Sequence, residues 1–347
     1  MHLKRLIAVG LTGALVAGAP IATGAAPRKK SARAAVSYIA SKQKPGGAIP
    51  AFSKIGSTSD AVLALAAARR GPRPMNRALD YLAEQVRDPA GAEERVDTVG
   101  ELAKVVLAAV AGGRDPRRFG SRNLIAEIKG TQLASGRYGR RTAVLDHALA
   151  MLALRAARAA DRIIPARRAA RWLKDAQCRD GGWQYDKPVG PKDDLHCSTG
   201  EEDDFFTTDT NTSSYAYQAL RYRRKLLNHN ALRFFTRARD RARNGWGYSP
   251  GSLTDANSTA LVLQAFASSN QAAPKGSLRA LRRLQYRLCG KRGGAFAFTW
   301  EPKSGGGYRR SGRDLGATIG AVPGLLGRPL PLRPVAVTKG VPRRKPC

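Results

Sequence analysis

One unit recurs along most of this chain. It consists of a helix that ends near a polar residue, a loop closed by glycine and an aromatic residue, and a second, more apolar helix. The ends of the first helices align at Gln43, Gln85, Gln132, Gln177, Asp240 or Arg241, and Gln285. Apart from one longer step, the spacing is about 45 residues, which is typical of helical-hairpin repeats. Six such units are enough for a closed double ring of helices.

The second helix of each unit is expected to begin at an oxygen-bearing side chain that can cap it. The sequence places these starts near Asp60, Asp97, Thr142, Asp209, Asp255 and Asp314. The stretches that follow, such as residues 61–65 and 260–263, are apolar nearly all round, as in helices buried on most sides. The first helices alternate Arg and Lys with apolar residues, so they are predicted to form the outer ring.

The first 26 residues have the pattern of a secretory signal peptide. Lys4 and Arg5 precede an apolar run over residues 6–22, and small residues follow, with cleavage expected near Ala26 or Pro27. A membrane anchor is the alternative, but the run contains Gly and Pro and is short for a span. We therefore expect a secreted or extracytoplasmic protein whose mature chain has no membrane span.

The repeats predict one domain over residues 27–328, followed by a Pro-rich C-terminal tail over residues 329–347. Two insertions interrupt the repeats: an acidic one over residues 186–208 and a Gly-rich one over residues 290–312. The acidic insertion could bind calcium, a cationic ligand or the chain's own arginines, and because it has no EF-hand spacing, internal ion pairing is favoured.

The net charge of +34 is unusual for a globular chain. Such a surface attracts anionic polymers, which makes an anionic cell-surface polymer a possible partner. Arginine recurs along most of the helices, as it does on solvated faces. Because no nucleic-acid-binding motif accompanies the charge, nucleic acid is not favoured as a partner.

Four cysteines in an exported chain predict disulfides, and three pairings are possible. We favour Cys178 with Cys197, which closes a short loop, and Cys289 with Cys347, which would anchor the tail. The alternative is a zinc site formed by Asp194, His196 and Cys197. That spacing matches no strong ligand pattern, so no metal and no other cofactor is predicted.

Two motifs resemble a known superfamily. The first, similar to the QW repeat of triterpene cyclases, consists of Trp172, Leu173, Gln177, Gly182 and Trp183. The second, an Asp followed by Thr at the start of an apolar helix, occurs at Asp97-Thr98 and Asp209-Thr210. Together they resemble the terpenoid cyclase/protein prenyltransferase superfamily over residues 31–326. The resemblance implies an all-α fold, an (α/α)6 toroid of six helical-hairpin repeats, and says little about activity.

The chemistry of that superfamily is only partly matched. Class II cyclases protonate a polyene with the middle Asp of a DxDDTA motif, and a general acid must be a carboxyl group. The residues that precede the candidate inner-helix aspartates are Ser59, Val96, Thr208, Thr254 and Arg313. None is a carboxylic acid. The zinc ligands of protein prenyltransferases, an Asp, a Cys and a His from separate repeats, are not reproduced either.

Three functions remain open: an exported non-catalytic binding protein, a divergent isoprenoid- or polysaccharide-acting enzyme, and a wall-associated structural protein. The missing acid favours binding of a small or hydrophobic ligand. In a closed toroid the capping aspartates and the aromatic loops meet at one rim, which we expect to hold the ligand. The predicted ligand-binding residues are Trp246, Tyr248, Phe298, Trp300, Asp209 and Asp255.

Overall fold

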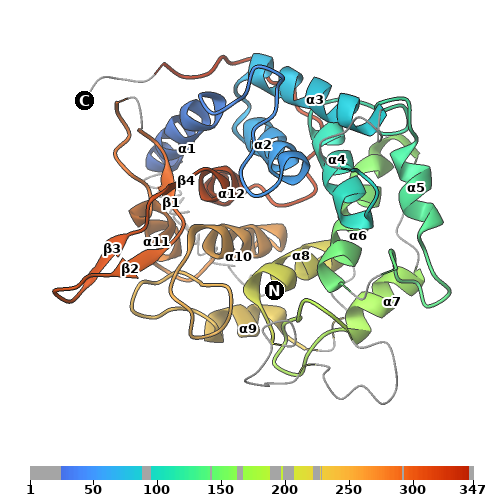
Figure 1. Cartoon of the computed structure of the whole chain (residues 1–347). Helices are drawn as coiled ribbons and strands as arrows, with labels where there is room; N and C mark the ends of the chain where they lie inside the picture. Colours follow the sequence, from blue (N-terminus) through green and yellow to red (C-terminus); the bar gives the residue numbers. More distant parts are fainter. Residues whose placement is uncertain are drawn as a thin grey trace, which may run out of the picture.

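The computed structural model describes residues 25–87, 95–140, 143–161, 167–187, 197, 207–221, 227, 229–290 and 293–343. Within these residues, twelve helices alternate between two rings (Figure 1). The outer ring contains α1 (Ala25–Ala40), α3 (Pro72–Arg87), α5 (Leu124–Gly130), α7 (Arg167–Asp175), α9 (Ala231–Arg237) and α11 (Ser277–Arg283). The inner ring contains α2 (Lys54–Ala68), α4 (Val99–Ala111), α6 (Val144–Asp161), α8 (Thr210–Leu220), α10 (Ala256–Ser268) and α12 (Leu315–Leu326).

The inner ring is closed. Each inner helix packs against the next one along the chain, and α12 packs against both α10 and α2. Figure 1 shows the ring from one end, with the outer helices surrounding the inner ones. The expected (α/α)6 toroid of six helical hairpins is therefore confirmed. One continuous hydrophobic core of buried side chains joins the helices.

Three inner helices begin where the sequence predicts. Asp209, Asp255 and Asp314 directly precede α8, α10 and α12. Each carboxylate accepts a hydrogen bond of 2.6 to 2.7 Å from the backbone N–H three residues further on. These bonds satisfy donors that the first turn of a helix leaves unpaired.

The predicted start of α2 is wrong. This helix begins at Lys54, and the Ser53 hydroxyl accepts a hydrogen bond from the backbone N–H of Gly56 as the cap. Asp60 therefore lies inside the helix rather than in front of it. A serine caps a helix as well as an aspartate does, so the earlier of the two polar residues starts the helix here.

Asp97 is not a cap either. Thr98 caps α4, and it forms a capping box with Glu101, whose side chain bonds back to the cap. Such a box satisfies two backbone donors at once, which favours Thr98 over its neighbour. Thr142, the remaining predicted start, lies outside the described residues, and α6 begins at Val144.

Glutamines at the ends of outer helices join neighbouring units. Gln177 Nε2 donates to Gly181 O (2.9 Å) in its own loop and to His229 O (3.0 Å) near the start of α9. Gln285 Nε2 donates to Ser31 O of α1 at 3.0 Å, across 254 residues of sequence. The last unit is thereby bonded to the first.

Trp183 and Trp246 close two of the loops that follow. Both are fully buried, and their indole N–H groups donate to Leu173 O (2.8 Å) and Phe235 O (2.6 Å). In five units, a side chain near the start of the inner helix also accepts a hydrogen bond from the backbone N–H of the loop. These side chains are Thr58, His147, Ser213, Thr259 and Thr318.

The C-terminal tail packs on the toroid, although the sequence suggested that only a disulfide could anchor it. Gln218 Oε1 of α8 accepts a hydrogen bond from the backbone N–H of Leu330 at 2.8 Å. Further along, Lys339 O accepts from the backbone N–H of Gly71 (2.8 Å), and Pro342 O accepts from Ser37 Oγ (2.7 Å).

The Cys178–Cys197 disulfide is confirmed, with a Cα–Cα distance of 5.2 Å. Cys347 lies outside the described residues, so its bond with Cys289 stays a prediction. The acidic insertion over residues 186–208 also lies mostly outside them. In the described part of the chain, no helix is long and apolar enough to cross a membrane.

The Gly-rich insertion over residues 290–312 forms short antiparallel strands before α12. β1 (Phe296–Ala297) pairs with β4 (Arg313–Asp314), and β2 (Trp300–Pro302) pairs with β3 (Tyr308–Arg310). Figure 1 shows the β2–β3 hairpin projecting outward from the ring.

Candidate ligand cavity

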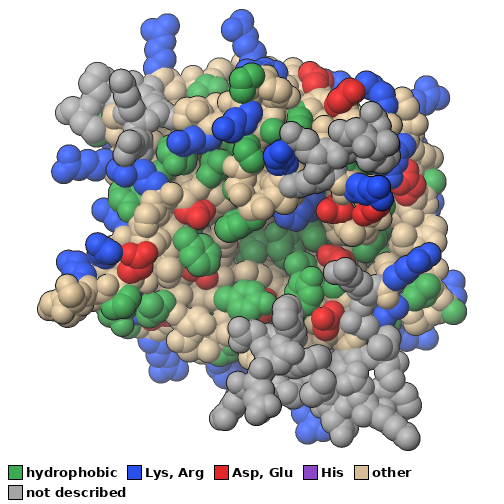
Figure 2. Space-filling model, in the orientation of Figure 1, with side chains coloured by type: hydrophobic (Ala, Val, Ile, Leu, Met, Phe, Trp, Pro, Cys, Tyr) green, Lys and Arg blue, Asp and Glu red, His purple; other side chains and the backbone are tan. Residues whose placement is uncertain are grey.

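A cavity of about 250 Å³ lies at the centre of the inner ring. Figure 2 shows the hollow at the middle of one face, where hydrophobic side chains gather, while Lys and Arg side chains project around the periphery. Much of its wall is apolar, formed by Leu63, Leu107, Leu145, Leu149, Leu261, Ile319, Pro323 and Leu330. Its polar side chains are Ser57, Asp60, Lys104, Asn211, Tyr215, Asn257 and Gln264.

The repeat explains which side chains reach this cavity. In an α-helix, side chains two positions apart point in directions that differ by about 200°. If one residue faces the outer loop, the residue two positions later therefore faces the lumen. Five inner helices bond to their loops through a side chain near their start, and the residue two positions later lines the cavity in each case. These lining residues are Asp60, Leu149, Tyr215, Leu261 and Gly320.

Lys104 of α4 forms an ion pair with Asp60 of α2 within the cavity. The Lys104 Nζ to Asp60 Oδ2 distance is 2.8 Å, and both side chains are only partly exposed. Burial acts to lower the pKa of Lys104, but the Asp60 carboxylate, Tyr215 and Asp146 together raise it above its usual range. Lys104 is therefore an ammonium group at neutral pH.

Tyr215 reaches the same polar region from α8. Burial and then the nearby Asp60 carboxylate raise the pKa of Tyr215 to about 12. Its phenol therefore stays protonated at neutral pH and can donate a hydrogen bond. An ammonium group, a carboxylate and a phenol together can orient a ligand that carries one polar group.

One glycine makes room for the carboxylate of Asp146, which acts on Lys104. A Cβ at Gly100 would lie 2.4 Å from Oδ1 of Asp146, so a larger residue there would push that carboxylate away. Nearby, the buried Oδ1 of Asn211 has no hydrogen-bond partner among the described residues, and its side chain lines the cavity.

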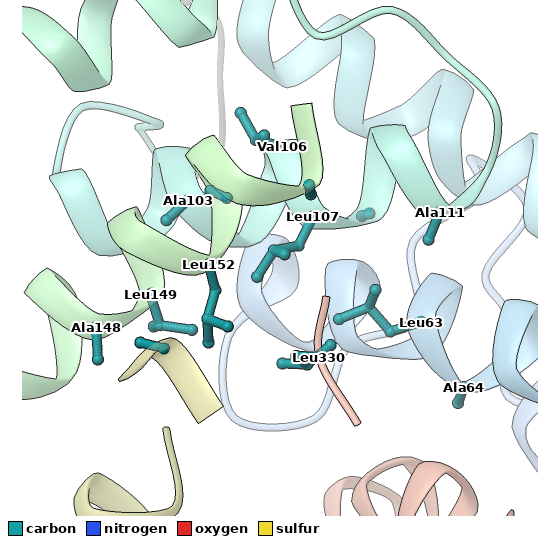
Figure 3. Close-up of a cluster of buried hydrophobic side chains, with 14 of the residues drawn as sticks. Leu63, Ala64, Ala103, Val106, Leu107, Ala111, Ala148, Leu149, Leu152 and Leu330 are labelled. Atoms are coloured by element: carbon teal, nitrogen blue, oxygen red, sulfur yellow. The ribbon is translucent and has the colours of Figure 1, made fainter. Parts of the chain in front are cut away.

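The tail closes one end of the cavity. Leu330 is buried, and Figure 3 shows it on its own segment among Leu63, Leu107 and Leu149 of three inner helices. Near the opposite end, towards the starts of the inner helices, Phe52 lines the cavity and is 76% exposed. A Cβ at Gly316 would lie 2.5 Å from the Phe52 ring, so this glycine lets the ring approach α12 closely.

The structure does not bring the six predicted ligand residues into this cavity. Trp246, Asp209 and Asp255 are buried residues with packing or capping roles, and ligand contact by them stays a prediction. The reason is local, because the loops fold back onto their own helices and cover these side chains. Burial raises the pKa of Asp209 to about 7 and that of Asp255 to about 6, although hydrogen bonds from the helix N-terminus act to lower both.

The other three predicted residues are accessible, and ligand contact by them stays a prediction. Phe298 is 39% exposed, and Tyr248 is half-buried. Trp300 lines a separate groove beside the β2–β3 hairpin. The sequence does not predict Asp60, Lys104 and Tyr215 as cavity residues, because Asp60 has the pattern of a helix cap and no motif marks which helix face points to the lumen.

The alternative zinc site cannot use one of its three predicted ligands. Cys197 is disulfide-bonded, whereas Asp194 and His196 lie outside the described residues. Across the part of the chain that the structure describes, no group of three or more His, Cys, Asp and Glu side chains could hold a metal ion.

No model of a known protein family matches the sequence, and no curated protein matches it significantly. Solved structures do match the fold along nearly their whole length. A type II terpene cyclase from Scytonema has a TM-score of 0.57 at 12% identity, over 86% of this chain and 97% of that one. A D-mannose isomerase has a TM-score of 0.62 at 12% identity, over 89% and 99%.

Carbohydrate-acting proteins are also among the matches. A variant of an alpha-1,6-mannanase from Salegentibacter has a TM-score of 0.56 at 11% identity, over 87% of this chain and 98% of that one. An unsaturated glucuronyl hydrolase specific for heparin has a TM-score of 0.58 at 11% identity, over 87% and 96%. The chain thus has the α/α toroid fold of several enzymes, and at these identities the likeness concerns the fold alone.

Proposed function

We propose that the chain is an exported, non-catalytic binding protein that holds a small amphipathic molecule in the centre of the toroid. The observation that carries the proposal is a cavity with largely apolar walls, closed at one end by Leu330, whose polar groups include the Asp60–Lys104 pair. In such a cavity the apolar body of a ligand displaces water from the leucines, and a few polar groups fix its orientation.

The size of the cavity supports a small ligand. Its volume of about 250 Å³ is just below the range of about 300–1,000 Å³ that is typical of ligand pockets. A cavity of this volume favours a small molecule over a folded polyprene. The binding site proposed here is therefore the lumen, and the loop rim is at most an entrance to it.

The lining residues also argue against polyene cyclisation. A general acid must present a proton to the substrate, and the position ahead of each inner-helix aspartate lacks a carboxyl group. Among the described residues that line the cavity, Asp60 is the carboxylate, and it accepts a hydrogen bond from the Lys104 ammonium. This pair suits the recognition of a polar head group better than the delivery of a proton.

A calorimetric titration tests the proposal. The probes are straight-chain amphiphiles of equal length with an amine, an alcohol or a carboxylate at one end. We expect one molecule to bind per chain, with a negative heat-capacity change from apolar burial. Leu261→Trp, which fills the lumen from α10, should abolish binding, whereas Leu133→Trp on the exposed surface should not. Equal binding by both variants, or no binding by the parent protein, would refute the proposal.

An enzyme remains the second candidate, because the structural neighbours named above include a terpene cyclase and carbohydrate-acting enzymes. The chain would then be a divergent terpene cyclase/prenyltransferase-like or polysaccharide-acting enzyme. Incubation with squalene, prenyl diphosphates and acidic or neutral polysaccharides distinguishes the two candidates. Turnover that disappears in Asp60→Asn, with the melting temperature retained, would establish the enzyme.

Export is part of the proposal. It is supported by the apolar leader after Lys4 and Arg5 and by the Cys178–Cys197 disulfide, because disulfides persist in oxidising compartments. Expression of the full chain with N-terminal sequencing of the released protein tests this point. A mature start near Ala26 or Pro27 is expected, and retention of Met1 in an undivided cytoplasmic product would contradict it.

A further inference from the structure

A second concave surface lies outside the ring, beside the β2–β3 hairpin. It is a groove of about 720 Å³ between this hairpin, α11 and the loop that follows α9. We call it the Arg–aromatic groove, and it is lined by Ala242, Arg243, Ala280, Arg283, Trp300, Tyr308, Arg309 and Arg310. None of these residues lines the central cavity. Apart from two alanines, the lining consists of arginine and aromatic residues.

The two aromatic residues lie on one face of the hairpin. Trp300 pairs with Arg310, and Tyr308 lies two residues before Arg310 on the same strand, so the three side chains share a face. Tyr308 is 48% exposed. The hairpin projects from the ring (Figure 1), and nothing among the described residues buries the Tyr308 ring completely.

Two of the four guanidinium groups are held in place before any ligand binds. Arg243 lies over the Tyr308 ring, 4.0 Å from its centroid, and pairs with Asp240 at 3.4 Å. Arg310 lies 4.6 Å from the centroid of the Tyr286 ring and donates to Gln285 O. Fixed guanidinium groups lose little conformational freedom when they bind carboxylates.

The remaining two arginines leave a net positive charge on the groove. Arg309 pairs with Glu301 at 3.4 Å, but both side chains are well exposed, so solvent screens the pair strongly. Arg283, at the end of α11, makes no ion pair with another described residue. The groove therefore combines a half-exposed Tyr308 ring and a partly buried Trp300 with planar cations, and it retains the capacity to bind anions.

We propose that the Arg–aromatic groove binds a segment of an acidic polysaccharide. Sugar rings would stack on Tyr308 and Trp300, and carboxylates of neighbouring sugars would receive hydrogen bonds from Arg283 and Arg243. Single-stranded nucleic acid uses the same pair of interactions. The disulfide Cys178–Cys197 favours the polysaccharide, because it indicates an oxidising compartment outside the cytoplasm.

Binding of oligogalacturonate to the full chain, measured by fluorescence titration of the tryptophans, tests this inference. We expect an affinity that falls steeply with salt and is lost when the oligosaccharide is methyl-esterified, because esterification removes its charge. Tyr308→Ala should weaken binding about fivefold or more, whereas Tyr308→Phe, which keeps the ring, should retain it.

The matched charge control is Arg171→Ala on the exposed surface of α7. Arg283→Ala should weaken oligogalacturonate binding more than Arg171→Ala does, at equal melting temperatures. Equal effects of the two variants would show diffuse attraction by the basic surface and overturn the proposal. Tighter binding of single-stranded DNA of equal charge, with displacement of the oligogalacturonate, would assign the groove to nucleic acid instead. Failure of the amphiphile titration of the central cavity would leave this result unaffected, because the two sites share no residue.

Discussion

Asp209 both caps a helix and is fully buried, and at neutral pH these two conditions favour opposite charge states of its carboxyl group. Its carboxylate caps α8 by accepting a hydrogen bond from the backbone N–H of Thr212, yet the residue is fully buried. Burial dominates and raises the pKa of Asp209 to about 7, against 3.8 for an ordinary aspartate. As the pH rises from about 4 to 7, the unfolded chain releases this proton while the folded chain retains it. The contribution of Asp209 to stability is therefore fully present below about pH 4 and is lost as the pH rises through 7.

Asp209→Asn tests this pH dependence. Asparagine caps a helix as well as aspartate does, but it does not titrate. The free energy of unfolding of the variant, measured by urea denaturation, should equal that of the parent near pH 4 and exceed it by about 1–3 kcal/mol at pH 8. Asp255 is unchanged in both proteins and cancels in the comparison. If the free energies of unfolding of the two proteins ran parallel over the whole pH range, burial would not raise the pKa of Asp209.

His147 shows how a different side chain performs a shared task. Its Nδ1 accepts a hydrogen bond from the backbone N–H of Tyr138, the task that threonine or serine performs in four other units. Burial lowers the pKa of His147 to about 3, so the imidazole stays neutral. Its stabilising effect is present above the ordinary histidine pKa of about 6.5 and is lost as the pH falls towards 3. His147 and Asp209 therefore act in opposite directions as the pH changes.

At the scale of the helix, α12 is distinguished by the glycines that face its neighbours. A Cβ at Gly324 would lie 2.6 Å from Cα of Ala260, so the two inner helices α10 and α12 touch backbone to backbone. Helices can approach this closely only where a side chain is missing. Their spacing in turn sets the distance between Leu261 and Ile319, which lie on these adjacent helices and both line the cavity.

Gly324→Ala should therefore destabilise the protein although alanine is the better helix former. We expect a loss of about 1–2 kcal/mol in the free energy of unfolding, because the cost of overpacking exceeds the gain in helix propensity. Gly130→Ala at the end of α5 is the matched control, since nothing lies within 4 Å of its added Cβ. It should be neutral or slightly stabilising. Equal effects in thermal denaturation would mean that α10 and α12 separate at little cost.

Much of this element-level arrangement could be predicted from the sequence. The spacing of the glutamines and of Trp183 and Trp246 indicated paired helices, and three capping aspartates marked the starts of α8, α10 and α12 correctly. The cavity could not be predicted in the same way. Asp60 is an aspartate like the true caps, but Ser53 caps α2, so Asp60 lies inside that helix and lines the lumen.

The Asp60–Lys104 pair depends on a second fact that sequence spacing does not contain. The two residues are on different helices, and their 2.8 Å contact requires that α2 and α4 be side by side in a particular register. Thr58 and Thr259 do indicate which positions face the lumen, because each lies two positions before a residue that lines the cavity. Recognising that correspondence requires knowing which hydroxyls bond to the loops.

At the scale of the whole molecule, the tail completes the toroid. Leu330 supplies part of the cavity floor, and the segment around Lys339 and Pro342 is hydrogen-bonded to Gly71 and Ser37 near the beginning of the ring. Two truncations separate these roles. A chain ending at Arg333 loses the hydrogen bonds to the first unit but keeps Leu330, whereas a chain ending at Arg328 loses both.

We expect amphiphile binding to survive in the chain that ends at Arg333 and to be lost in the chain that ends at Arg328. The chain that ends at Arg328 lacks the buried Leu330. Its free energy of unfolding should therefore be about 2–5 kcal/mol lower than that of the chain that ends at Arg333. Titration calorimetry and urea denaturation of both proteins provide the measurement. Retained binding in the chain that ends at Arg328 would show that ligand binding in the lumen does not depend on Leu330.

The hydrogen bond from Gln285 to Ser31 has a consequence for synthesis. Its two partners are separated by 254 residues. At the place where the last unit meets the first, α1 therefore lacks this bond until the sixth unit has left the ribosome. An open solenoid can fold unit by unit from its first repeat, but a ring must bring its ends together against a large loop-closure entropy. Folding of this chain should therefore be slower than that of a linear repeat protein of equal length. Until closure, the apolar sides of the first and last helices remain available to chaperones or to the ends of a second chain.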